Sequence, residues 1–265
     1  MVEPLLRARG VNKRFGGLQA LADVGIAIDR GQVYGLIGPN GAGKTTFFNV
    51  LTGLTVPDAG EFELDGRRYW PKEAHRVAQL GIARTFQNIR LFPEMTALEN
   101  VMVGRHARCR ANALDAVLRT PRARAEEAAI RIDSLKLMQD IGIDRYAQHQ
   151  ARTLPYGDQR RLEIARALAT EPKLLALDEP AAGMNATEKD GLRALLQRIR
   201  ATGVTILLIE HDVKLVMGLC DRVTVLDYGK VIAEGSPYDV QRDAAVVEAY
   251  LGTPHPQAQP RRALA

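Results

Sequence analysis

The chain has 265 residues, of which 46% are hydrophobic and 25% charged, and its formal net charge is +5. No apolar run approaches the roughly 20 residues that span a bilayer, and the first residues are polar, so we expect a cytosolic chain without membrane spans. Cys109 and Cys220 lack the spacing of a metal or disulfide framework. The positive charge is compatible with nucleic acid, anionic lipid, an acidic partner or nucleotide phosphates.

Short apolar runs typical of buried strands alternate with helical patterns along most of the chain. Because neighbouring positions in these runs are all apolar, we expect strands that are covered on both faces. Residues 192–199 place leucine and isoleucine on one helix face. Strands interleaved with helices predict an α/β domain with a mainly parallel sheet. The predicted strands are residues 24–28, 33–37, 174–177, 204–209 and 223–226.

Other parts of the chain predict further layers. Residues 24–28 and 61–65 alternate apolar and polar side chains near turns, which favours a small antiparallel β layer. Residues 89–153 are rich in Ala, Arg, Leu and Glu, which favours a helical insert. The segment 253–265 contains proline without an apolar pattern, and we expect a flexible tail. The predicted division is 1–88 with 154–252 for the core, 89–153 for the insert subdomain and 253–265 for the tail.

A phosphate-binding loop is predicted at residues 38–45, which read Gly-Pro-Asn-Gly-Ala-Gly-Lys-Thr and match G-x-x-x-x-G-K-[ST]. The loop follows a predicted strand and precedes a helix-like run, which is the context that the pattern requires. Lys44 is expected to reach the β- and γ-phosphates, and Thr45 to hold Mg²⁺. The alternative is a glycine-rich turn that only links strand to helix. The predicted nucleotide-binding residues are Gly38, Pro39, Asn40, Gly41, Ala42, Gly43, Lys44, Thr45 and Thr46.

Two adjacent acids, Asp178 and Glu179, follow the apolar strand at 174–177. Side chains at the carboxyl end of a parallel strand lie where α/β sheets bind ligands. We expect Asp178 to hold Mg²⁺ and Glu179 to orient the attacking water or accept its proton. The alternative is a solvated strand end before Pro180. Together with the phosphate loop, the acid pair predicts nucleotide hydrolysis.

These motifs, with five further elements in the same order, resemble the ATP-binding subunits of ABC transporters over residues 4–252. The resemblance implies a P-loop NTPase (RecA-like) core, with ATP and Mg²⁺ as cofactors. It also implies that Phe15 stacks on adenine, that Gln87 contacts Mg²⁺ and water, and that His211 contacts the γ-phosphate. Each of the three has a plain structural alternative. The implied catalytic residues are Glu179, His211, Gln87 and Lys44, and the implied metal ligands are Thr45, Gln87 and Asp178.

Residues 154–168 resemble the signature segment of this family, whose helix start faces the nucleotide bound by the opposite subunit. Gly157 is therefore expected to bind ATP in trans. Pro155 stands where the family usually has serine, and Tyr156 stands where it has glycine, so the hydroxyl contact is lost. Asn185 stands for the usual aspartate of a loop at the dimer interface. The change at Pro155 and Tyr156 implies a weaker ATP contact on the side that this signature completes, and the lost charge at Asn185 implies altered communication between the subunits.

Four segments resemble one branch of the family, the ATPases of high-affinity branched-chain amino-acid importers. The segments are 156–166, 178–183, 209–218 and 249–252. The resemblance implies ATP-driven, head-to-tail dimerisation with a second, related ATPase. It further implies permease subunits, a periplasmic binding protein, and a peripheral place on the cytoplasmic face of the bacterial inner membrane. A permease helix is expected against residues 87–99, including Arg90, Leu91 and Phe92.

Other functions are compatible with parts of the sequence. A urea-import or lipopolysaccharide-export ATPase would share the phosphate loop and the acid pair. A soluble ABC ATPase that acts on nucleic acid would suit the basic charge, but such proteins usually carry two ATPase modules or a long coiled coil. A simple P-loop kinase would lack the signature segment and His211. We therefore expect a transport ATPase without a nucleic-acid partner.

Overall fold

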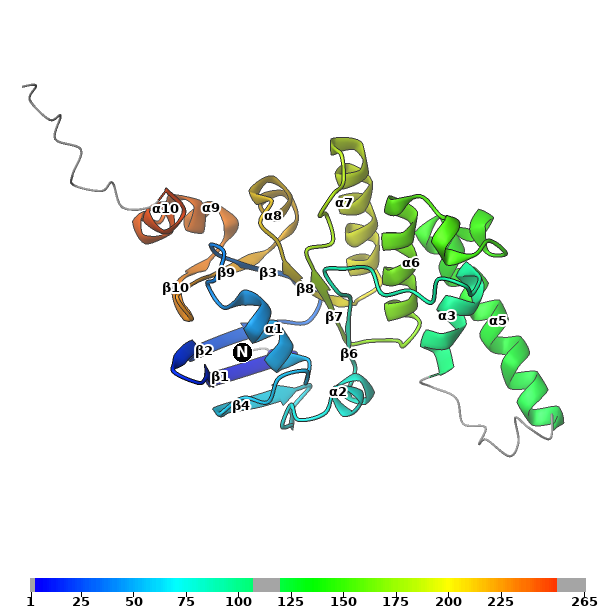
Figure 1. Ribbon diagram of the computed structural model, residues 1–265, viewed down its shortest axis with the longest axis horizontal. Coiled ribbons are helices and arrows are strands. Elements are labelled where there is room, and N and C mark those ends of the chain that lie inside the picture. The colour runs from blue at the N-terminus through cyan, green and yellow to red at the C-terminus, as the bar shows by residue number, and fades with distance from the viewer. Residues whose placement is uncertain (1–2, 107–119, 252–265) are drawn as a thin grey trace, which may run out of the picture.

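The computed structural model describes residues 3–106 and 120–251, so the predicted tail lies outside the described residues. The strands of this part form two sheets (Figure 1). The smaller, antiparallel sheet contains β2 (Leu18–Ile28), β1 (Leu6–Phe15), β4 (Ala59–Leu64) and β5 (Arg67–Arg68), in that order. The larger sheet contains β10 (Lys230–Gly235), β9 (Arg222–Asp227), β3 (Val33–Ile37), β8 (Thr205–Ile209), β7 (Leu174–Asp178) and β6 (Ile82–Arg84), in that order.

Helices connect the strands of the larger sheet, and most of its neighbouring strands run parallel. Only β10, at one edge of the described sheet, runs antiparallel to its neighbour β9. The helices are α1 (Lys44–Leu51), α2 (Ala74–Leu80), α3 (Ala97–His106), α5 (Pro121–Ile141), α6 (Tyr156–Leu168), α7 (Ala186–Ala201), α8 (Val213–Leu219), α9 (Pro237–Arg242) and α10 (Ala244–Leu251), with 3₁₀ turns at Asp144–Tyr146 and Ala151–Thr153.

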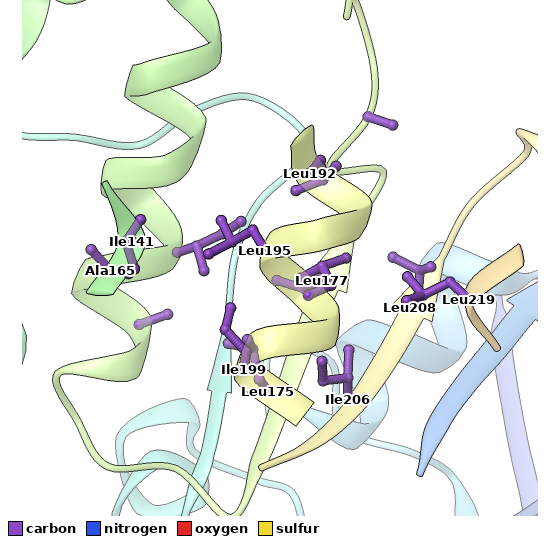
Figure 2. Close-up of a cluster of buried hydrophobic side chains, with 14 of the residues drawn as sticks. Ile141, Ala165, Leu175, Leu177, Leu192, Leu195, Ile199, Ile206, Leu208 and Leu219 are labelled. Carbon is purple, nitrogen blue, oxygen red and sulfur yellow. The ribbon is translucent and has the colours of Figure 1, made fainter. Parts of the chain in front are cut away.

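Two hydrophobic cores lie on opposite faces of the larger sheet. Because successive side chains of a strand alternate between faces, each strand supplies both cores. In β7, Leu175 and Leu177 join the core under the helices, whereas Leu174 belongs to the core shared with α1 and the smaller sheet. Figure 2 shows Leu175 and Leu177 beside the apolar face of α7. The predicted helix face at 192–199 is confirmed, since its leucines and Ile199 are buried.

The predicted fold class is confirmed, but four strands were not anticipated: β1, the two-residue β5, β6 and β10. β1 is the central partner of the predicted antiparallel layer, since it pairs with both β2 and β4. Its sequence, LRARGVNKRF, buries only Leu6, Ala8 and Val11, and its other residues are polar apart from Gly10 and the exposed Phe15. β6 and β10 were missed because they are short or half-exposed edge strands. Four of the five predicted strands match observed strands to within a residue at each end, whereas 24–28 is only the second half of β2.

Helices account for most of the described part of residues 89–153. α5 begins at Pro121, where Thr120 Oγ1 caps the helix by accepting from Ala123 N, and it ends at Gly142 with φ 80°. α3 lies very close to α6, because a Cβ added at Gly104 would lie 2.2 Å from the Arg166 carbonyl oxygen. Among the described residues, no helix is long and apolar enough to span a membrane.

Candidate functional site

The loop between β3 and α1 has the backbone that its glycines predict. Gly38, Gly41 and Gly43 all have positive φ, at 148°, 82° and 100°. A Cβ at Gly38 would lie 2.1 Å from the Leu226 carbonyl oxygen, and one at Gly43 would lie 2.7 Å from the Ala20 carbonyl oxygen. The loop can therefore adopt this curve only with glycine at positions 38 and 43. A loop curved in this way turns its backbone N–H groups toward an anion.

Lys44 opens helix α1 and is 8% exposed. Its Nζ donates to the carbonyl oxygens of Gly38 at 2.7 Å and Pro39 at 2.9 Å, so the side chain folds back over the loop. Burial lowers the pKa of Lys44, while Glu179 and Asp178 act in the opposite direction. A buried cation held by weak carbonyl acceptors is well suited to exchange them for phosphate oxygens.

A cavity of about 460 Å³ opens above this loop. It gathers Phe15 and Gln87, which lie far from the loop in the sequence, and it reaches Glu179. Gly38 and Pro39 are not among its lining residues, but their carbonyl oxygens accept from Lys44, which is. The lining residues are Phe15, Leu18, Gln19, Ala20, Asn40, Gly41, Ala42, Gly43, Lys44, Thr45, Thr46, Gln87, Glu179, Tyr228 and Gly229.

Several lining residues were missed from the sequence. Residues 18–20 begin β2, and Tyr228 and Gly229 form the turn after β9. Gly229 N donates to the Ala42 carbonyl at 2.9 Å, so this turn supports the phosphate loop directly. The position of Tyr228 and Gly229 in the sequence could have indicated them, because a turn at the carboxyl end of a parallel strand lies at the ligand-binding edge of the sheet.

Asp178 and Glu179 lie at the end of β7 with different surroundings. Asp178 is buried, and its Oδ2 lies 3.5 Å from Arg84 Nη2. Burial raises the pKa of Asp178, and the Arg84 cation opposes this rise. Glu179 has a positive φ of 46°, which is rare for a residue with a side chain. Its N–H donates to the Ile209 carbonyl at 2.9 Å, which fixes this unusual backbone against β8.

Gln87 and His211 both approach one oxygen of Glu179. Gln87 Nε2 donates to Glu179 Oε2 at 2.8 Å, and His211 Nδ1 lies 3.7 Å from the same oxygen. The structure therefore brings together Glu179 and Gln87, which were predicted beside the reacting water, and His211, which was predicted to contact the γ-phosphate. A carboxylate held between an amide and an imidazole, at the mouth of a phosphate-loop cavity, can orient a water molecule and accept its proton.

The predicted magnesium ligands are an oxygen set of the kind that Mg²⁺ prefers. Thr45 and Gln87 line the cavity, and Asp178 lies at the end of the strand beneath Glu179. Within residues 3–106 and 120–251, no three His, Cys, Asp or Glu side chains cluster as a complete metal site. Mg²⁺ takes few protein ligands beside phosphates and water, and a hydroxyl, an amide oxygen and a carboxylate are ligands of that kind. The residues present therefore fit the ion.

The loop that carries Gln87 is held by a buried ion pair on α6. Arg160 is fully buried, and its Nη1 lies 2.8 Å from Glu163 Oε2. Arg160 also donates to the carbonyl oxygens of Phe86 and Gln87, both at 2.7 Å. Glu163 Oε1 accepts from the backbone N–H groups of Phe86 and Arg90, both at 3.3 Å. The signature helix therefore fixes the backbone of the Gln87 loop, an arrangement that sequence reasoning did not anticipate.

The signature glycine lies apart from this cavity. Gly157, in the first turn of α6, does not line the cavity, and a Cβ there would lie 3.2 Å from Glu188 Oε1. Pro155 is the N-cap of α6 and has no side-chain acceptor to offer. Tyr156 is half-exposed, and its hydroxyl donates to the Ala182 carbonyl at 3.1 Å. Asn185 caps α7 by accepting from Glu188 N at 3.0 Å.

A second cavity, of about 440 Å³, lies between α2, α3 and α6. Phe92 lines it together with Arg84, Phe86 and Arg166. Arg90, which was also expected there, instead stacks on Phe86 at 4.1 Å from the ring centre. Leu91 packs partly buried against the main core. Three arginines, Arg84, Arg90 and Arg166, thus cover the phenylalanines of this cavity with their guanidinium groups.

The comparisons with known proteins agree with this geometry. A family model for ABC transporters matches residues 21–182, and one for branched-chain amino acid ATP-binding cassette transporters matches residues 230–256. The high-affinity branched-chain amino acid transport ATP-binding protein BraF of Pseudomonas aeruginosa is 44% identical, over 95% of this chain and 99% of its own length.

Solved structures show the same fold. The ADP conformation of MJ1267, an ATP-binding cassette of an ABC transporter, matches with a TM-score of 0.83 and 32% identity, over 95% of this chain and 100% of that one. The dimeric cassette MJ0796 matches with a TM-score of 0.74 and 25% identity, over 88% of this chain and 98% of that one. The chain belongs to the ABC transporter family, and it is an ATP-binding subunit that hydrolyses ATP to drive transport.

Proposed function

We propose that ATP hydrolysis by this chain drives the import of branched-chain amino acids. The observation that carries the hydrolytic part is the contact of Gln87 and His211 with one oxygen of Glu179, at the mouth of the phosphate-loop cavity. The substrate class follows from similarity to BraF along nearly the whole chain and from the second family model at residues 230–256.

In this proposal each residue of the site has a distinct role. The N–H groups of the loop at 38–46 and the Lys44 ammonium bind the phosphates. Thr45, Gln87 and Asp178 would hold Mg²⁺, which would supply positive charge to neutralise the phosphates. Phe15, half-exposed on the cavity wall, stacks on adenine. The remaining roles are those of Glu179, which accepts the proton of the attacking water, and of His211, which contacts the γ-phosphate.

The site is completed by a second ATPase subunit. Gly157 lies outside the cavity of its own chain, so its N–H and the start of α6 are available to a nucleotide bound by a partner. Such a head-to-tail pair places ATP within the interface, and hydrolysis releases it. The partner in this proposal is a related but distinct ATPase, as the resemblance to importers of this branch implies.

The permease subunits dock on the cavity between α2, α3 and α6. This cavity is next to the Gln87 loop, and Arg160 connects that loop to the signature helix. Motion at the nucleotide can therefore reach the permease through a short path. In this proposal residues 89–153 are the helical insert subdomain that carries part of this docking surface, and residues 1–88 with 154–252 are the core. A periplasmic binding protein supplies the amino acid, and the chain resides on the cytoplasmic face of the inner membrane.

An uptake assay tests the proposed function. The gene is deleted in its host, and the uptake of radiolabelled leucine, isoleucine and valine is followed, with labelled urea as a parallel substrate. We expect amino-acid uptake to be lost, and to be restored by the wild-type chain but not by Glu179→Gln. Normal amino-acid uptake in the deletion strain, with loss of urea uptake instead, would assign the ATPase to another importer.

A further inference from the structure

Glu210 lies between strand β8 and His211, and none of the roles described above uses it. Its side chain is buried, with 1% exposed. Its two oxygens accept from two different loops: Oε1 from Ala181 N at 2.9 Å, and Oε2 from His211 N at 3.2 Å. Asp212 N lies at a longer 3.5 Å from Oε2. One side chain thus links the loop that follows Glu179 to the loop that carries His211.

This link depends on a carboxylate. Burial raises the pKa of Glu210, while the backbone donors and the nearby His211 act in the opposite direction. Burying such a group is unfavourable unless its oxygens are hydrogen-bonded, and here both are. A glutamine offers a single acceptor oxygen, so it could bond one loop and would turn its NH₂ group toward the donor of the other.

A second link joins the same two segments a few residues further on. Lys189, in the first turns of α7, places its Nζ 2.6 Å from Asp212 Oδ2. The other oxygen of Asp212 caps α8 by accepting from Leu215 N at 3.2 Å. His211 therefore sits between two anchored residues, Glu210 and Asp212. Its own side chain is 60% exposed and lies beside Glu179.

We propose that Glu210 is a positioning residue for His211, and that Lys189 with Asp212 assists it. The two links hold the backbone on each side of His211 to the segment that follows Glu179. They thereby set the position of the imidazole relative to the carboxylate, and they carry movements of the loop at 181–185 to His211. This inference rests on the proposed roles of His211 and Glu179, and it adds residues that do not themselves touch ATP.

The test compares Glu210→Gln with the wild-type chain, each purified full-length from its host together with the subunits that accompany it. The readouts are MgATP turnover, KM for ATP, the free energy of unfolding, and the imidazole NMR signals of His211, assigned with His211→Ala. We expect turnover to fall about 10-fold or more, since small misplacements of reacting groups have effects of that size. KM should stay within about twofold, because the phosphate loop is untouched. The His211 signals should shift.

Lys189→Met is the second variant, and it tests the positioning of His211 if Glu210→Gln does not fold. Lys189 pairs at the surface, so its removal opens no core cavity, and we expect a two- to fivefold loss of turnover, about the strength of an exposed ion pair. Lys173→Met is the matched control, because Lys173 forms a similar pair with Asp65, away from the cavity. Its turnover should equal that of the wild type.

Two results would overturn the inference. One is a Glu210→Gln chain of normal stability with wild-type turnover and unchanged His211 signals. The other, which applies if Glu210→Gln does not fold, is a Lys189→Met chain whose turnover equals that of the wild type and of Lys173→Met. Wild-type hydrolysis in the same assay separates the two levels: if the wild type itself hydrolyses no ATP, the proposed function fails, whereas equal activity of wild type and variants removes only the role of Glu210.

Discussion

The two glycines Gly38 and Gly41 offer a matched test of how the phosphate loop is built. Both have positive φ, so alanine at either position is strained. At Gly41, nothing lies within 4 Å of an added Cβ, whereas at Gly38 the Cβ would lie 2.1 Å from the Leu226 carbonyl oxygen. Leu226 belongs to β9, which is paired with β3 and β10, so this carbonyl cannot move without disturbing the sheet.

The expected free energies differ because only one site adds a clash to the strain. Gly41→Ala should lower the free energy of unfolding by about 1 kcal/mol, the conformational term alone. Gly38→Ala should lower it by about 4 kcal/mol, since overpacking against fixed backbone adds about 1–3 kcal/mol to the strain. For a domain of this size, these values correspond to about 3 °C and about 12 °C in Tm.

The assay is chemical and thermal unfolding of the nucleotide-free chain. ATP binding provides a second readout. Gly38→Ala should weaken ATP binding at least about tenfold, because a displaced loop start no longer points its N–H groups toward the phosphates. Equal destabilisation by the two substitutions would refute the reasoning. It would mean that conformational strain, rather than the closeness of β9, accounts for glycine at position 38.

Four further predictions concern other parts of the molecule. Phe15→Ala should weaken ATP binding about 5- to 30-fold, since stacking on a base contributes about 1–2 kcal/mol, and a tyrosine there should restore it in equilibrium titrations; equal affinity of all three would contradict stacking. Pro155→Ser should stabilise α6 by about 1 kcal/mol through a new N-cap and strengthen ATP-driven dimerisation, as measured by sedimentation; an unchanged dimer would contradict the γ-phosphate contact. Arg90→Glu should leave ATP hydrolysis intact but uncouple it from uptake in reconstituted vesicles. Unaffected uptake would contradict a role for Arg90 in docking the permease. Burial raises the pKa of the Cys220 thiol from 9.0 to about 12, so the folded chain favours the neutral form. The free energy of unfolding should therefore hold below pH 9 and decline toward pH 12. In a variant without the other cysteine, the native thiol should resist Ellman's reagent at pH 8, and rapid labelling there would contradict its burial.

Most of the site was predictable because its residues follow a simple rule of parallel sheets. The phosphate loop, Glu179, Gln87 and His211 follow β3, β7, β6 and β8, which are neighbours in the larger sheet. Their carboxyl ends therefore meet at one edge. The same rule would have indicated Tyr228, after β9, but a Tyr-Gly turn has no chemical signature of its own. The signature glycine could be placed only through the family resemblance, because its partner is another chain.

The buried charges could not be predicted in the same way. Arg160 bonds the carbonyls of residues 73 and 74 positions away, and the Glu210 carboxylate reaches a backbone N–H 29 positions away. Locally, Arg160 is a typical charge on an exposed helix face, and Glu210 is a typical acid after a strand. Only the packing of α6 and β8 against distant loops turns them into structural links. β1 was missed for a related reason, since its strand conformation depends on pairing with β2 and β4 rather than on its own polar sequence.

The most direct measurement of the central claim is ATP turnover by Glu179→Gln beside the wild type. The substitution keeps the size of the side chain and its contact with Gln87 but removes the base. We expect the variant to bind ATP as tightly as the wild type and to hydrolyse it about 100-fold more slowly or worse, with the ATP-bound dimer accumulating. Turnover within a few-fold of the wild type would contradict the claim that the carboxylate between Gln87 and His211 activates the water.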